Sequence, residues 1–190
     1  FKRGQTFLKR ASSKALGKRV DRDVVKLVVK EDPASSSLKK RKRKKKPLAL
    51  HPYTQQLVRF WEHLGLRPVA AQLFVPLPNI GKATQADVIV EDVRDGKLWM
   101  HEIKTGWVGV TNTKGTFAGE LSHVKYSKGA AWDLQRHYTA QGLIAAGLPI
   151  QGSRVVHIYE DTKKGILVEY RPIIFGSTDH HHHKKETVCV

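Results

Sequence analysis

The chain is poor in cysteine, in acidic residues and in long apolar runs. Its single cysteine, Cys189, stands next to the last residue, which excludes a disulfide scaffold and any zinc site built from cysteines. No apolar run approaches the roughly 18 residues that a membrane-spanning helix needs, and no signal-peptide pattern is present. We therefore expect no membrane partner.

The shortage of acidic residues is concentrated in one part of the chain. The whole sequence has 34 basic and 17 acidic residues and a formal net charge of +17. Residues 1–46 hold 18 of the basic residues and only four of the acidic ones, whereas residues 47–190 are nearly balanced. The composition predicts a largely disordered basic arm over 1–46, a folded domain over 47–176 and a His-rich tail over 177–190.

Eight consecutive basic residues dominate the arm, and their mutual repulsion predicts disorder in isolation. They are Lys39, Lys40, Arg41, Lys42, Arg43, Lys44, Lys45 and Lys46. Such a run binds a phosphate backbone by releasing counterions, and it resembles a nuclear localisation signal. We expect contact with DNA, with RNA as an alternative, and with an import receptor. The expected location is a nucleus or a virion for a eukaryotic or viral protein, and otherwise an intracellular site associated with nucleic acid. Residues 1–20 are basic and lack acids, so a mitochondrial destination stays open.

Hydrophobic periodicity after residue 50 predicts an α/β domain with the order helix, three strands, helix, two strands. The expected helices cover 51–64 and 130–146, and the expected strands cover 69–75, 87–93, 98–104, 155–159 and 166–170. Gly65 is expected to end the first helix.

The second and third strands are joined by a turn that contains Asp95 and Gly96, a pair typical of tight hairpins. Asp87 and Glu102 lie almost equally far from this turn, so the hairpin should bring their carboxylates nearly opposite each other. Glu102 and Lys104 are two residues apart in a strand and should project from the same face. The sequence therefore predicts two carboxylates and one ammonium around one point.

This combination suits phosphodiester hydrolysis. Mg²⁺ prefers carboxylate oxygens, usually one or two of them, and completes its shell with waters and phosphate oxygens. A bound divalent ion acidifies water and neutralises charge that develops on the phosphate. A neighbouring lysine such as Lys104 orients or deprotonates the attacking water.

The pattern of Asp87, fourteen intervening residues and then Glu102-Ile103-Lys104 resembles the PD-(D/E)xK nuclease superfamily. The resemblance covers roughly 51–172 and implies a restriction-endonuclease-like core, in which helices flank a central mixed β-sheet. It further implies a Mg²⁺-dependent deoxyribonuclease, with Mn²⁺ as a substitute. Asp87 and Glu102 would be metal ligands, the Ile103 carbonyl a third ligand, and Lys104 would contact the water. Ala86 stands where the superfamily's name-giving proline would be, a position that varies among its members.

Further residues extend the resemblance toward the RecB and lambda-exonuclease branch. Gln135 and Tyr138 on the second expected helix resemble the element that orders the site and the DNA there. Glu62 on the first expected helix matches an extra metal-facing acid of many members. Lys125 and Lys128, ahead of the second helix, are candidates for phosphate contacts.

Other readings of the same residues stay open. In one of them, Asp87 and Glu102 are surface carboxylates at strand ends, and Lys104 forms an ordinary ion pair. A nuclease-like fold also serves non-catalytic binding, for example in a virion core, and the cationic arm is typical of proteins that neutralise packaged genomes. An RNA-directed endonuclease is a third reading.

Overall fold

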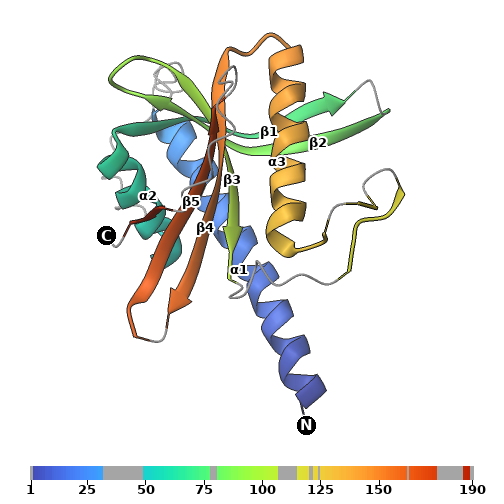
Figure 1. Cartoon of the computed structure of the whole chain (residues 1–190). Coiled ribbons are helices and arrows are strands. Elements are labelled where there is room, and N and C mark those ends of the chain that lie inside the picture. Colours follow the sequence, from blue (N-terminus) through green and yellow to red (C-terminus); the bar gives the residue numbers. More distant parts are fainter. Residues whose placement is uncertain are drawn as a thin grey trace.

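The structure, a computed structural model, describes residues 2–31, 49–77, 81–106, 115–119, 122–123, 125–161, 163–174 and 186–188. Within these ranges, three helices flank a mixed β-sheet (Figure 1). The helices are α1 (Lys2–Glu31), α2 (Pro52–Leu64) and α3 (Lys128–Ala145). The strands are β1 (Leu66–Leu77), β2 (Lys82–Asp92), β3 (Leu98–Thr105), β4 (Ile150–Asp161), β5 (Gly165–Ile174) and the short β6 (Glu186–Val188). The α/β class is therefore confirmed, and so is the order of elements from α2 to β5.

The strands lie side by side in their sequence order, from β1 to β6. Among the strands that the structure describes, only β3 and β4 pair in parallel, and the other neighbouring pairs are antiparallel. A parallel pair needs a long crossover connection, and α3 lies within the segment that joins β3 to β4. The sheet is therefore mixed because one helix interrupts an otherwise antiparallel succession of strands.

Two apolar clusters hold the helices on opposite faces of the sheet, with α1 and α2 on one face and α3 on the other. On β3, Ile103 and Trp99 pack in the α1/α2 cluster, whereas Met100 and Leu98 pack in the α3 cluster. This alternation is the one expected from the period of a strand. It places Glu102 and Lys104, which follow Leu98 and Met100 at two-residue steps, toward the α3 side.

Helix α2 begins and ends at the residues that the sequence indicates. The His51 side chain accepts a hydrogen bond from Tyr53 N at the helix start. Gly65 ends the helix with φ +66°, a left-handed conformation that glycine adopts without steric cost. The periodic apolar residues of this helix, Leu57, Phe60 and Trp61, are almost completely buried.

Two predictions about the chain ends are corrected. The expected disorder over residues 1–46 is wrong for Lys2–Glu31, which form α1, because Val20 and Val24 bury their side chains in the α1/α2 cluster. The predicted tail over 177–190 is not separate throughout, since Glu186–Val188 pair with β5. The basic run Lys39–Lys46 and the four histidines of the tail lie outside the described residues. No helix in the described part of the chain is long and apolar enough to cross a membrane.

Helix α3 approaches β1 very closely at Gly142. A Cβ atom there would lie 2.6 Å from Val75 Cγ1 and 2.8 Å from Leu77 Cδ2, both shorter than normal contact distances. Glycine at this position therefore lets α3 lie close to β1 at the edge of the sheet.

Docking of α1 predicts a stability effect. Val20→Ala and Val24→Ala should each lower the free energy of unfolding by about 2 kcal/mol, because each removes two buried methyl groups and leaves a cavity. Val93→Ala removes the same atoms at a side chain that is 60% exposed and should change stability by less than about 0.5 kcal/mol. Urea unfolding measures all three; equal effects at Val24 and Val93 would contradict the docking of α1.

Candidate active site

The β2–β3 hairpin brings Asp87 and Glu102 together, as the sequence predicts. The antiparallel ladder pairs Val88 with His101, so Asp87 and Glu102 occupy the next step of the same register. Ile103 N donates a hydrogen bond to Asp87 Oδ2 at 2.8 Å. The two carboxylates are therefore anchored from adjacent strands at the end of the hairpin farthest from its turn.

Lys104 and Gln135 complete the cluster. Lys104 Nζ lies 2.5 Å from Glu102 Oε1, and it also donates a hydrogen bond to Gln135 Oε1 at 3.2 Å. Gln135 comes from α3, so this contact links the helix to the end of β3. These contacts bring Asp87, Glu102, Lys104 and Gln135 together, and their chemical roles remain predictions.

Glu102 is buried with one oxygen unsatisfied. Its side chain is 0% exposed, and Oε2 has no hydrogen-bond partner within the described structure. Burial, followed by the negative charge of Asp87, raises the pKa of Glu102 to about 7, against the lowering effect of Lys104. Burial also raises the pKa of Asp87, despite the Lys104 charge and the hydrogen bonds from Ile103 and Gln72. Two buried acids here share one ammonium, which does not neutralise both.

A third acid, Asp21 on α1, approaches the same place and was missed by the sequence reasoning. Helix α1 crosses the end of β3, where a Cβ atom on Gly17 would lie 3.3 Å from Thr105 Oγ1. Asp21 lies one turn further along the same helix face. Burial and the charge of Asp87 raise the pKa of Asp21 to about 6, and Lys104 opposes this. The site therefore carries more negative than positive charge.

The backbone opposite Asp87 is strained. Gln72 lies in β1 between Ala71 and Leu73, which pair with Val88 and Ala86. Its φ of +54° is the only left-handed value among the described non-glycine residues. Such a conformation is unfavourable for a residue with a Cβ atom, and residues of this kind cluster at functional sites.

His101, the neighbour of Glu102, lies on the opposite face and is held neutral. Trp61 Nε1 donates a hydrogen bond to its Nδ1 at 3.1 Å, and Arg154 Nη1 lies 3.3 Å from its Nε2. Burial and the charge of Arg154 lower the pKa of His101 well below its usual 6.5. His101 therefore belongs to the α1/α2 side of the sheet and contributes no charge to the site.

Two other predicted site residues do not join the cluster. The expectation that Glu62 faces the metal is wrong, because Glu62 is exposed near the end of α2, beside the turn of the β2–β3 hairpin. Gly65 N donates a hydrogen bond to Glu62 O and Val93 N donates one to Gly65 O, whereas Asp87 lies at the other end of the hairpin. Tyr138 is 43% exposed, and its ring packs against His137. No contact within the described structure joins Tyr138 to Glu102 or Lys104.

The predicted phosphate contacts surround the start of α3. Lys128 is the first residue of this helix, and Lys125 is exposed in the segment before it. The segment ends at Ser127, whose side chain accepts a hydrogen bond from Ala130 N and caps the helix.

The residues present fit a divalent ion that takes few protein ligands. Among the described residues, no three Asp, Glu, His or Cys side chains lie close enough together to hold a metal by themselves. Asp87 and Glu102 nevertheless supply the one or two carboxylates that Mg²⁺ usually takes from a protein. The buried, unpartnered Oε2 of Glu102 needs a cation or a proton, since an unsatisfied buried charge is costly.

Comparison of the chain with protein-family models, with curated proteins and with solved structures gave no match.

The raised pKa of Glu102 predicts how metal-free stability depends on pH. In the folded protein the Glu102 carboxyl keeps its proton up to about pH 7, whereas in the unfolded chain it loses the proton near pH 4.5. Stability contributed by this group is thus complete below pH 4.5 and is lost as pH rises to 7, on the order of 3 kcal/mol. His101 acts in the opposite direction. Because its pKa is lowered in the folded protein, this group reduces stability as pH falls below 6.5.

The difference in unfolding free energy between wild type and Glu102→Gln separates the contribution of the Glu102 carboxyl from that of His101, which is present in both proteins. We expect the variant to gain stability relative to wild type as pH rises from 4.5 to 7, measured by urea unfolding in EDTA. A difference that is independent of pH would contradict the raised pKa.

Proposed function

We propose that this protein is a divalent-metal-dependent nuclease that hydrolyses phosphodiester bonds in DNA. The observation that carries the proposal is the buried Glu102, whose free Oε2 lies in a cluster with Asp87 and Lys104. The mixed sheet is compatible with the restriction-endonuclease-like core, since the strands that carry the motif are adjacent and α3 lies in the connection that follows them.

Asp87 and Glu102 are the proposed metal ligands, and the Ile103 carbonyl is a third. The Ile103 N–H supports this arrangement, because its hydrogen bond to Asp87 Oδ2 fixes one carboxylate relative to the backbone of the other strand. Asp21 adds negative charge near this pair without being a third carboxylate ligand. When bound, Mg²⁺ or Mn²⁺ acidifies water and neutralises charge on the phosphate.

Lys104 holds the attacking water in this proposal. Its ammonium already contacts Glu102 Oε1 and Gln135 Oε1, so two acceptors from different elements limit where Nζ points. An ammonium has three donors, which leaves one for water or phosphate. Gln135 is therefore a positioning residue that acts through Lys104, and Tyr138 offers an exposed ring to the DNA rather than to the metal.

The charge distribution favours a polyanionic substrate. The eight residues Lys39–Lys46 concentrate positive charge, and Lys125 and Lys128 add positive charge ahead of and at the start of α3. Release of counterions from DNA would strengthen binding without sequence recognition. Import-receptor binding and location in a nucleus or virion remain proposals that rest on the same run.

A non-catalytic nucleic-acid-binding role, as in a virion core, is the second candidate. The net charge of +17 favours it, because a charge of this size supports DNA binding whether or not the metal site acts. It gives no account of the buried carboxylate cluster.

Cleavage assays separate the two candidates. Linear, circular and single-stranded DNA and RNA are incubated with Mg²⁺, Mn²⁺ or EDTA. We expect metal-dependent cutting of DNA and a loss on the order of 10²- to 10⁴-fold in Lys104→Ala, the range for a group that acts on a transferred proton. Lys97→Ala removes the same charge from an exposed lysine at the turn and should leave cutting unchanged.

If wild-type protein binds these nucleic acids but cuts none of them with either metal, the nuclease proposal is contradicted and the second candidate is favoured. Equal cutting by Lys104→Ala and Lys97→Ala would contradict the role given to Lys104.

A further inference from the structure

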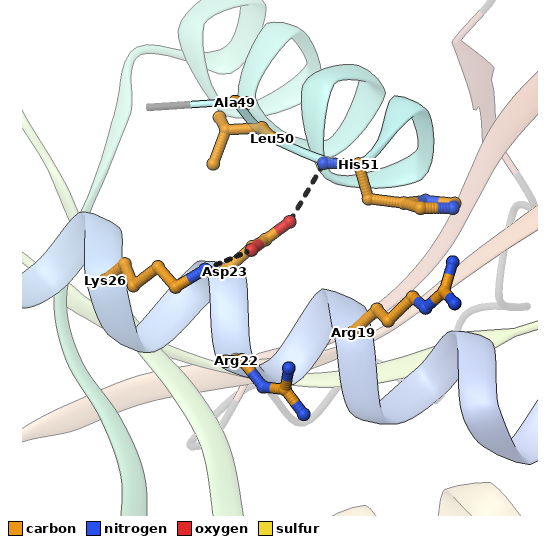
Figure 2. A pocket seen from close by; sticks show the side chains of 7 residues that line it. All are labelled: Arg19, Arg22, Asp23, Lys26, Ala49, Leu50 and His51. Carbon is orange, nitrogen blue, oxygen red and sulfur yellow. Dashed lines mark hydrogen bonds and ion pairs between the residues drawn. The ribbon is translucent and has the colours of Figure 1, made fainter. Parts of the chain in front are cut away.

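A cavity of about 300 Å³ lies between α1 and the start of α2, and three cationic side chains line it (Figure 2). The lining residues are Arg19, Arg22, Asp23, Lys26, Ala49, Leu50 and His51. Figure 2 shows the Arg19 guanidinium turned toward the His51 ring, while Lys26 points to Asp23. With His51 neutral, this lining carries a net charge of +2.

The single carboxylate of the cavity is already occupied. Asp23 Oδ1 pairs with Lys26 Nζ at 3.1 Å, and Oδ2 accepts hydrogen bonds from His51 N at 2.9 Å and Thr54 Oγ1 at 3.4 Å. Burial alone would raise the pKa of Asp23, but the bonds from His51 and Lys26 outweigh it and lower the pKa. Asp23 is thus ionised and satisfied, and it is not available to the arginines.

Arg19 and Arg22 have no ion-pair partner among the described residues. Together with Lys26 they follow the spacing i, i+3, i+7 and therefore share one face of α1. Both arginines are exposed, so their guanidinium groups are accessible from solvent. Guanidinium donors form a planar fork that matches the oxygens of a phosphate group.

The cavity is separate from the candidate active site. Asp21 faces Asp87 from α1, whereas Arg19, Arg22 and Lys26 lie about 100–160° away around the helix axis. The two sites therefore use different sides of one helix.

The cavity also lies where the basic run joins the fold. Only Pro47 and Leu48 separate Lys46 from Ala49, which lines the cavity with Leu50. A polyanion attracted by the run is therefore brought near Ala49, which lines the same cavity as Arg19 and Arg22.

We propose that the cavity lined by Arg19, Arg22, Lys26 and His51 binds a backbone phosphate of nucleic acid at a distance from the cutting site. The inference takes its nucleic-acid partner from the proposed function, but it concerns binding alone and holds equally for a protein that does not cut. It adds to the basic run a structured contact of fixed position.

Binding to a fluorescent DNA duplex, followed by anisotropy in EDTA over a series of NaCl concentrations, tests the proposal. Arg19→Gln/Arg22→Gln should weaken binding on the order of tenfold and reduce the slope of log affinity against log salt by about 1, the effect of losing one phosphate contact. The matched control, Lys163→Gln/Lys164→Gln, removes two exposed charges from the β4–β5 turn outside the cavity and should lose distinctly less affinity.

An unchanged slope in the arginine variant, or an equal loss in the lysine control, would overturn the proposal. Inorganic phosphate serves as the second probe and should raise the melting temperature of wild type more than chloride of equal ionic strength, but not that of the arginine variant. Stabilisation by phosphate together with an unchanged DNA slope would assign the cavity to a small phosphorylated molecule and reject the nucleic-acid contact. Because EDTA prevents cutting, a failed nuclease assay leaves these outcomes unaffected.

Discussion

Burial of the Glu102 carboxyl beside Asp87 is the constraint around which this end of the sheet is organised. An acid without exposed surface and with one unpaired oxygen is costly unless a proton or a cation compensates it. Lys104 satisfies the other oxygen, Gln135 holds Lys104 from α3, and Ile103 N satisfies Asp87. The register of β2 and β3 brings the two carboxylates together, and the contact between Gln135 and Lys104 ties α3 to them.

Helix α1 contributes both to the candidate active site and to the positively charged surface of the domain. One side of the helix buries Val20 and Val24, a second carries Asp21 toward Asp87, and a third presents Arg19 and Arg22 at the cavity beside α2. The basic part of the chain is thus not wholly an appendage. It supplies a structural helix, an acid near the candidate metal site and a candidate phosphate contact before the run Lys39–Lys46 begins.

The elements that the sequence predicts well are those with strong local signals. The spacing of Leu57, Phe60 and Trp61 predicts α2, and the Asp95–Gly96 turn predicts a hairpin whose register sets Asp87 against Glu102. Helix α1 was not predicted over its full length, because its overall charge obscured an apolar series with helical spacing, Leu16, Val20, Val24 and Leu27. Glu62 was misplaced because its position depends on where α2 ends in the fold. The end of this helix lies beside the turn of the β2–β3 hairpin, and local helical spacing does not carry that information.

The most direct measurement of the central claim is a calorimetric titration with Mn²⁺ on wild type, Glu102→Gln and Glu62→Gln, in two buffers of different ionisation enthalpy near pH 6.5. Glu62→Gln makes the same chemical change at an exposed helix residue and serves as the control. The account predicts binding with proton release in wild type and in the control, because the pKa of Glu102 is raised to about 7 and a metal needs the ionised form. It predicts lost or strongly weakened binding in Glu102→Gln. Equal binding by the two variants, or no binding by wild type, would contradict it.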